Sequence, residues 1–278
     1  MAWASKTYRE GEGLHSDIFR AAILMMEDGH EDAAVFRLIR DAANQVDDRA
    51  VPDREIRDAI LYARLRMEGG EPAAPRWPAP DPGYRAEIVR ITGQPLDQLQ
   101  HNAKILPQEP TRWLNLLFRP EDFVCLGQST YAFSTQLRDA AIRLTQVAPY
   151  EFVNPNPMTA EAGRTKAGAL SAHCLDNAGP RVRLVIEFDD GSAYEHAACL
   201  RWLARRRPLE LAVWSGGKSM HGWFNFLGAD EAVMASFFHE AVLLGADARL
   251  WSPCQFVRLP GGRRSDTGAI QKVLYCAL

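Results

Sequence analysis

The chain has 278 residues, enough for one large domain or a core with a smaller domain, and a formal net charge of -3. Apolar residues make up 47% and charged residues 24%, as in ordinary globular proteins, so the composition excludes a uniformly basic nucleic-acid binder of the histone type. No apolar run has the length of a membrane span, and the N-terminus lacks the basic start and apolar stretch of a signal peptide, so we expect no membrane partner.

Residues 1–68 predict a small helical domain. Apolar residues recur at helical spacing in three segments, which contain Ile18, Ala21, Ala22 and Met25, then Val35, Leu38, Ile39 and Ala42, then Ile56, Ala59, Ile60 and Ala63. Residues 69–83 are rich in proline, glycine and alanine, which disfavour regular backbone pairing. This stretch is therefore predicted to be a linker.

Residues 84–180 form a mixed region whose pattern is harder to interpret. Thr111–Phe118 predicts a helix, although a short apolar run of this kind is also compatible with a strand. We expect short strands at Phe123–Leu126 and Phe152–Val153, with a helix over residues 135–145 between them.

Residues 181–278 alternate between strand and helix signals. The predicted elements are strands at Val182–Asp189, Leu209–Ser215, Ser219–Leu227, Phe256–Leu259 and Ile270–Cys276, and helices at Ala193–Arg206 and Asp230–Leu244. The order is βαββαβ with one extra strand, which is the split βαβ, ferredoxin-like pattern. We therefore expect an α+β fold in which helices cover one face of the sheet and leave the other face open.

Glu187 and Asp189 are the first candidate site residues. Side chains two residues apart on a strand share a face and lie about 7 Å apart, so both would stand on the open face. Two carboxylates this close repel each other unless a cation lies between them, and Mg²⁺ or Mn²⁺ prefers oxygen ligands. The alternative is a pair of solvated acids at a strand end.

Lys218, Ser219 and His221 follow the glycine pair Gly216-Gly217. Glycines let a backbone approach an anion closely, and a lysine, a serine and a histidine could then hold a triphosphate. The alternative is a plain hairpin turn followed by a structural histidine.

Asp247 and Arg258 complete the candidate set. Asp247 follows the second predicted helix and is either a third site carboxylate or an ordinary acid in a helix-ending turn. Arg258 lies in an apolar strand, where an arginine is costly unless it meets an anion. That anion is either a ligand or one of the three acids above.

The candidate residues all fall on the strands and turns of one small predicted sheet. Two metal ions held by carboxylates would activate an attacking 3′-hydroxyl and stabilise the leaving pyrophosphate. The cationic and Ser/His groups would position the incoming nucleotide. The combination suits nucleotidyl transfer.

The five cysteines are scattered and form no CxxC pair. This argues against a zinc ribbon or finger, and we interpret them as reduced, mostly buried thiols of a cytoplasmic protein.

Three short motifs resemble the signatures of the archaeo-eukaryotic primase superfamily. They are Glu187-Phe188-Asp189, Ser219-Met220-His221 and Asp247. The flanking segments VIEFDD, SGGKSMHGWF, LGAD and FVRLPGG are similar to primase-polymerases of phages, plasmids and bacteria, as is NPNPM at Asn154–Met158. The resemblance covers roughly residues 110–278, and the order and spacing of the motifs make it fairly specific.

The resemblance implies a primase-polymerase core over residues 84–278. An α/β module would pair with an RRM-like module at about 181–278, with the catalytic cleft between them. Glu187, Asp189 and Asp247 would hold two divalent ions, Mg²⁺ or Mn²⁺. Lys218, Ser219 and His221 would contact nucleotide phosphates, and Arg258 the nucleotide or the template. The expected partners are single-stranded DNA, NTPs or dNTPs, and a helicase or another replication protein.

Two further hypotheses remain open. The chain could be a non-polymerising module that binds nucleic acid or a nucleotide in a replication initiator or a defence system. It could also be a metal-dependent nuclease, since paired acids serve hydrolysis too, although it lacks the His-hydrophobic-His pattern of rolling-circle nicking enzymes. The intact acids at all three motif positions favour the polymerase.

Overall fold

The computed structural model describes residues 14–44, a few positions between 53 and 64, residues 77–100 and residues 105–278. The chain divides into two compact units, Met1–Arg76 and Trp77–Leu278. The fold is mixed α+β, and the sheets of the described residues are antiparallel. None of the described helices combines the length and the apolar character that a membrane span needs.

The first unit contains α1 (Leu14–Glu27) and α2 (Asp32–Ala43). Its core includes most of the apolar residues expected from the helical spacing, together with described positions of the third predicted segment, such as Ile56 and Ile60. The prediction is wrong at Leu38, which is exposed, whereas Met25 is half-buried against this core and its neighbour Met26 is buried.

The second unit begins with three short helices that start at prolines. They are α4 (Pro82–Thr92), α5 (Pro95–Gln100) and α6 (Pro110–Leu117). Proline suits the first turn of a helix because its missing N–H has no partner there anyway. Residues 77–83, assigned to the linker from sequence, belong to this unit, and Asp81 caps α4 by accepting the Tyr84 N–H at 2.9 Å. The rest of the predicted linker, residues 69–76, lies outside the described residues.

One four-stranded sheet has the order β2-β1-β3-β9. Its members are β1 (Phe123–Gly127), β2 (Phe133–Leu137), β3 (Phe152–Val153) and β9 (Val257–Arg258), and α7 (Arg138–Val147) follows β2. The helix predicted over residues 135–145 is therefore wrong at its start, where Thr135 belongs to β2. A small separate hairpin joins β4 (Gly163–Arg164) to β5 (Leu170–Ser171).

The second four-stranded sheet has the order β10-β7-β8-β6. Its elements are β6 (Arg183–Phe188), α8 (Ala193–Leu203), β7 (Leu209–Trp214), β8 (Met220–Asn225), α9 (Glu231–Leu243) and β10 (Lys272–Cys276). In a ferredoxin-like sheet the last strand pairs with the first, but here β10 pairs with β7. The split βαβ unit is present, whereas the ferredoxin-like prediction for the last strand is wrong.

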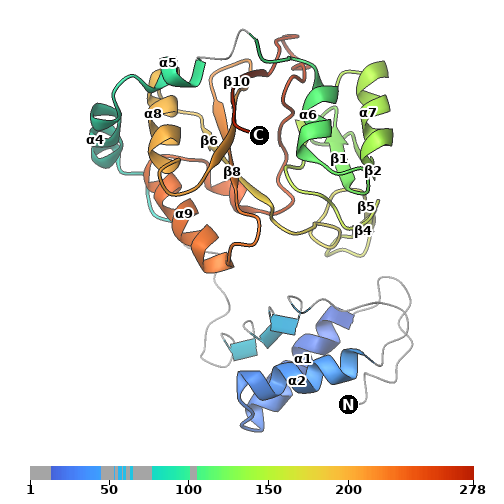
Figure 1. The fold of residues 1–278 in the computed structure, drawn as a ribbon. Coiled ribbons are helices and arrows are strands. Elements are labelled where there is room, and N and C mark those ends of the chain that lie inside the picture. The colour runs from blue at the N-terminus through green and yellow to red at the C-terminus, as the bar shows by residue number, and fades with distance from the viewer. Residues whose placement is uncertain are drawn as a thin grey trace. The chain divides into compact units, whose positions relative to one another are not determined.

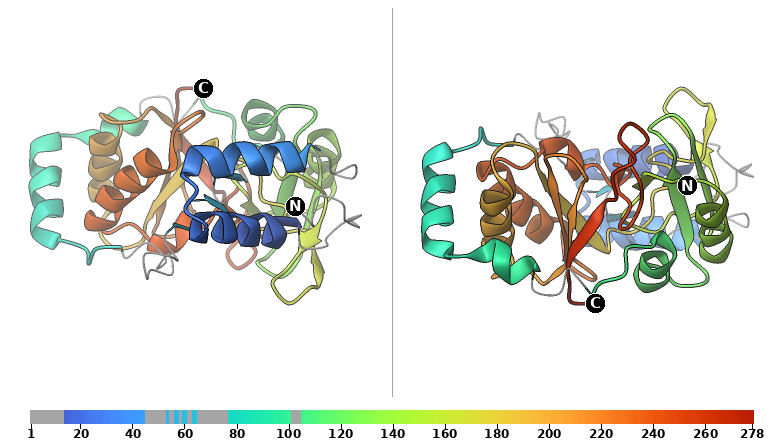
Figure 2. Two further views of the ribbon diagram at one scale, coloured as in Figure 1. Left: turned by 90° about the horizontal axis from the view of Figure 1, so that it is seen from below. Right: turned by 90° about the horizontal axis from the view of Figure 1, so that it is seen from above.

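Helices α8 and α9 cover one face of this sheet, and the segment with α6, α7 and β1 lies on its other side (Figures 1 and 2). Gly222 shows how close the helices are, because a Cβ built on it would lie 2.3 Å from Cδ2 of Leu200. The opposite face carries Val185, Val213 and Trp223, all buried. The expectation of an open face is therefore wrong: the first sheet and its helices cover most of it.

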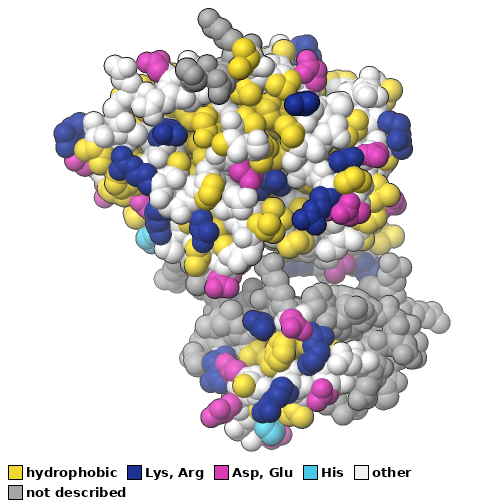
Figure 3. All heavy atoms as spheres, in the orientation of Figure 1, with side chains coloured by type: hydrophobic (Ala, Val, Ile, Leu, Met, Phe, Trp, Pro, Cys, Tyr) yellow, Lys and Arg dark blue, Asp and Glu magenta, His cyan; other side chains and the backbone are white. Residues whose placement is uncertain are grey.

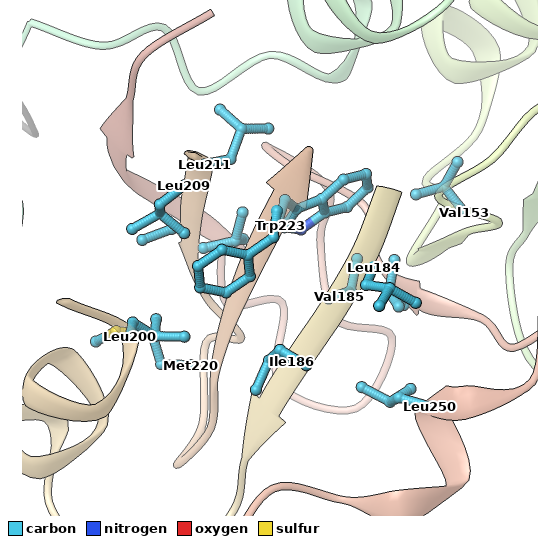
Figure 4. Close-up of a cluster of buried hydrophobic side chains, with 14 of the residues drawn as sticks. Val153, Leu184, Val185, Ile186, Leu200, Leu209, Leu211, Met220, Trp223 and Leu250 are labelled. Carbon is cyan, nitrogen blue, oxygen red and sulfur yellow. The ribbon is translucent and has the colours of Figure 1, made fainter. Parts of the chain in front are cut away.

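The two sheets share one hydrophobic core. Figure 4 shows part of it, with side chains from β3, β6, α8, β7, β8 and the 3-10 helix η1 (Ala248–Trp251). Asn156, from the NPNP segment, joins the modules at the free edge of β6. Its side chain accepts the Arg183 N–H at 2.7 Å and donates to the Arg183 carbonyl at 3.1 Å. This motif segment thus acts as a substitute strand partner.

Candidate active site

The three candidate carboxylates come together at the C-terminal end of β6. Glu187 is in the strand and Asp189 follows it directly. Asp247 arrives from the end of α9, where Ala246 forms an antiparallel bridge with Phe188 and the Asp247 N–H donates to the Glu187 carbonyl at 3.0 Å. Asp247 therefore lies beside the free edge of β6, which is the edge that a ferredoxin-like last strand would have covered.

Glu187 faces His221 across the β6–β8 ladder. Since the Glu187 carbonyl points to Asp247, the Glu187–His221 pair belongs to the narrow, non-hydrogen-bonded type. His221 Nε2 lies 3.1 Å from Glu187 Oε1 and 3.4 Å from the Ser219 hydroxyl. Burial would raise the pKa of Glu187, but His221, Ser219 and the charge of Arg258 together lower it to about 2.

Asp189 has the opposite pKa shift. Burial and repulsion by Glu187 and Asp247 raise the pKa of Asp189, against the attraction of Lys218 and His221. The backbone after Asp189 is held by two contacts. The Asp190 carbonyl accepts a hydrogen bond from Arg85 Nη2 at 2.6 Å and lies 2.9 Å from His196 Nε2. Asp189 is thus an acid crowded by negative charge on a well-anchored turn.

Asp247 already has a cationic partner. Its carboxylate accepts the Arg249 backbone N–H at 3.0 Å and the Arg249 guanidinium at 2.7 to 3.0 Å. The backbone contact caps η1, which begins at Ala248. The Arg249 side chain is 79% exposed and the Asp247 side chain 18%, so the arginine end of this pair faces solvent.

The segment Ser215–Ser219 makes the turn between β7 and β8. Gly216 has φ +80°, which favours glycine, and the Ser215 N–H donates to the Ser219 carbonyl at 3.0 Å. Lys218 is exposed, whereas Ser219 and His221 are buried. Of the three predicted phosphate-binding residues, Lys218 is accessible, whereas Ser219 and His221 are buried and His221 contacts Glu187.

Arg258 does not pair with any of the three site acids. It forms an ion pair with the buried Glu151 and lies over the Phe152 ring, 4.7 Å from its centroid. The sequence alternative of a salt bridge to Glu187, Asp189 or Asp247 is therefore wrong about the partner. The charge of Arg258 still reaches Glu187, whose pKa it helps to lower.

The donor chemistry of the site suits a hard divalent cation, since three carboxylates converge from β6 and the end of α9. Within the described part of the chain, however, no three His, Cys, Asp or Glu side chains already form a group that could hold a metal ion. Glu187 is engaged by His221 and Asp247 by Arg249. The carboxylates are close enough to repel one another, but their side chains are not arranged as a chelate.

The site residues that sequence reasoning missed hold the others in place. Glu151 orients Arg258, Arg85 and His196 anchor the turn after Asp189, and Arg249 neutralises Asp247. Each is a single charged or polar residue that belongs to no sequence motif. Its role depends on its partner in the folded structure, which the sequence does not indicate. Cys125, Cys174 and Cys199 are free and buried, as expected, while Cys254 and Cys276 are partly exposed.

Comparisons of the chain with protein-family models, with curated proteins and with solved structures each find no significant match.

Proposed function

We propose that this protein is a metal-dependent nucleotidyltransferase that makes or extends nucleic-acid strands on a single-stranded template, as primase-polymerases do. The observation that carries the proposal is the meeting of Glu187, Asp189 and Asp247 at one sheet end, through the bond from the Asp247 N–H to the Glu187 carbonyl. The resemblance of the three motifs to the primase superfamily agrees with this placement.

In this proposal the carboxylates and the residues around them have different roles. Glu187, Asp189 and Asp247 would hold Mg²⁺ or Mn²⁺, which when bound activates the attacking 3′-hydroxyl and neutralises the leaving pyrophosphate. His221 and Ser219 keep the Glu187 carboxylate ionised and in place.

Lys218 is exposed on the turn and its charge reaches Asp189, so it is suited to meet a nucleotide phosphate beside the carboxylates. Arg258 is oriented by Glu151 and adds positive charge near Glu187. On the face shown in Figure 3, Lys and Arg side chains are interspersed with acidic and apolar ones.

One observation favours a second candidate, a non-polymerising module that binds nucleotide or nucleic acid. Two of the three carboxylates already have an internal partner, His221 for Glu187 and Arg249 for Asp247, and the described residues contain no preformed metal-binding group. Such internal pairing is expected in a protein that keeps the fold of a polymerase but has lost its catalytic activity.

The deciding experiment measures incorporation of labelled NTPs and dNTPs on single-stranded DNA with Mg²⁺ or Mn²⁺, with and without a primer. Wild type is compared with Glu187→Ala/Asp189→Ala. Metal-dependent products that vanish in the double variant support the polymerase and show whether it primes. Nucleotide binding without any product supports the binding module.

A further inference from the structure

A hairpin spanning residues 263–270 lies against the Gly216-Gly217 turn. Arg263 and Ile270 form an antiparallel bridge, and the Arg264 N–H donates to the Ala269 carbonyl at 3.0 Å. A Cβ built on Gly216 would lie 3.1 Å from Cβ of Ala269 and 3.3 Å from Cδ of Arg264. The hairpin therefore packs directly on the turn that carries Lys218.

Arg264 presents one unused nitrogen to this turn. Its Nε and Nη2 donate to the two carboxylate oxygens of Asp266 at 2.9 and 2.7 Å, which fixes the plane of the guanidinium. Its Nη1 has no hydrogen-bond partner among the described residues and lies 3.4 Å from a Cβ built on Gly217. An oriented guanidinium with a remaining donor can bind a phosphate oxygen directly.

Glu151 holds the hairpin to the same network that holds Arg258. Its Oε2 accepts the Ser265 backbone N–H at 3.0 Å and the Ser265 hydroxyl at 2.8 Å, while Oε1 pairs with Arg258. Glu151 is 5% exposed, so little solvent competes for these bonds. One buried carboxylate thus sets the position of two cationic segments.

Gln271, directly after the hairpin, provides a second observation. It is fully buried, yet its side-chain nitrogen and oxygen have no partner among the described residues. Since Lys272 pairs with Trp214, continuing the register puts Gln271 opposite Ser215, on the sheet face that carries His221. A buried amide without partners is costly until a polar group reaches it.

We propose that the 263–270 hairpin forms the second wall of the phosphate-binding site, with Arg264 as a residue that contacts the phosphates of a nucleoside triphosphate and Glu151 as the residue that positions the hairpin. This inference rests on the proposed function, because it takes the nucleotide as the ligand. It adds a phosphate contact that the three sequence motifs do not contain.

The test measures dissociation constants of the full chain for ATP, dATP, AMP and adenosine by calorimetry, with Mg²⁺ and without a template. Arg264→Gln should weaken triphosphate binding by about tenfold or more, because a charge-assisted hydrogen bond is lost, and adenosine binding much less. Arg264→Lys should restore part of the affinity through its charge. Arg143→Gln is the matched control: Arg143 is exposed on α7, outside the hairpin, and this variant should bind ATP as wild type does.

Glu151→Gln should weaken triphosphate binding in the same direction, with circular dichroism confirming that the fold is kept. Wild-type triphosphate affinity in Arg264→Gln, or an equal loss for adenosine, overturns this inference and leaves the polymerase proposal standing if the chain still extends primers. Absence of triphosphate binding by the wild-type chain overturns both proposals.

Discussion

The Asp247 N–H donates to the Glu187 carbonyl at 3.0 Å, so residues from the two ends of the βαββα unit meet at one strand edge. The edge of β6 is available for this contact because β10 pairs with β7 instead. The departure from a ferredoxin-like order is thus what lets the third carboxylate reach the first two.

Asp189 should be indispensable for synthesis. Replacing it with asparagine removes a proposed cation ligand, and we expect the rate of nucleotide incorporation to fall by at least about a hundredfold, because such ligands account for several kcal/mol of transition-state stabilisation. Asp190→Asn is the control, since the structure uses the Asp190 carbonyl and leaves its side chain exposed. Wild-type rates in Asp189→Asn would remove this residue from the site.

Arg249 should compete with cations for Asp247. Its side chain is 79% exposed and binds the Asp247 carboxylate, and an ion pair with a solvent-exposed partner contributes about 0.2–1 kcal/mol. Arg249→Ala should therefore raise the affinity for Mn²⁺ by roughly two- to fivefold, as measured by calorimetry. Arg201→Ala, on α8, should leave the affinity unchanged. A weaker Mn²⁺ affinity in Arg249→Ala would mean that Asp247 needs this arginine for its position.

Glu240 should stabilise the second unit above acidic pH. Burial raises the pKa of Glu240, but hydrogen bonds from Trp202, Arg206 and Tyr84 outweigh this and lower it. A carboxyl whose pKa is lower in the folded state contributes stability above its unfolded pKa of about 4.3 and loses it as pH falls through the folded value.

Glu240→Gln should accordingly lower the free energy of unfolding by about 1–3 kcal/mol at pH 7, since hydrogen bonds to a charged group are lost. The difference from wild type should shrink as pH falls below 4. Urea unfolding at both pH values measures this, and Glu87→Gln, at an exposed pair with Arg90, should match wild type at each. A deficit that is constant with pH would show that charge is not the cause.

Gly222 should not tolerate a side chain. A Cβ there would lie 2.3 Å from Leu200 and 3.0 Å from Phe224, both fully buried, so Gly222→Ala should destabilise the protein by about 1–3 kcal/mol through overpacking. Gly222→Ala/Leu200→Ala should cost less than the sum of the two single changes, because the methyl group fills space that Leu200 vacates. Strict additivity in thermal melts would contradict this contact.

Local patterns were enough to predict the central strands. Leu184, Ile186 and Phe188 alternate with Glu187, and Phe188 does stack on His196 of α8 at 6.0 Å. The glycine pair before β8 likewise marked a real turn, with Gly216 at φ +80°.

The wrong predictions concern strand pairing and side-chain contacts between distant segments, which the spacing of residues in the sequence does not indicate. Strands of two residues such as β3 and β9 contain too little pattern to say which sheet they join. The partner of Arg258 is Glu151, an acid that precedes β3 and stands in no motif. The covered sheet face was missed because the core that contains Val185 and Trp223 also includes residues of the first sheet and its helices, which lie far away in the chain.

The glycines of the FVRLPGG segment turned out to serve backbone packing. A Cβ on Gly261 would lie 2.8 Å from the Gln108 carbonyl oxygen, and one on Gly262 would lie 2.7 Å from that of Tyr150. A motif can thus mark close passage of two chains as readily as ligand contact.

The place of β9 in the first sheet has a consequence for attempts to express the two parts of the protein separately. This strand belongs by sequence to the C-terminal half but completes the sheet of the N-terminal half, beside β3. A fragment ending before residue 181 would leave the edge of β3 unpaired and prone to self-association, and its complement would carry β9 with no sheet to join. The two halves should therefore melt in one transition, and co-expression as separate polypeptides should recover soluble protein only when both are made together.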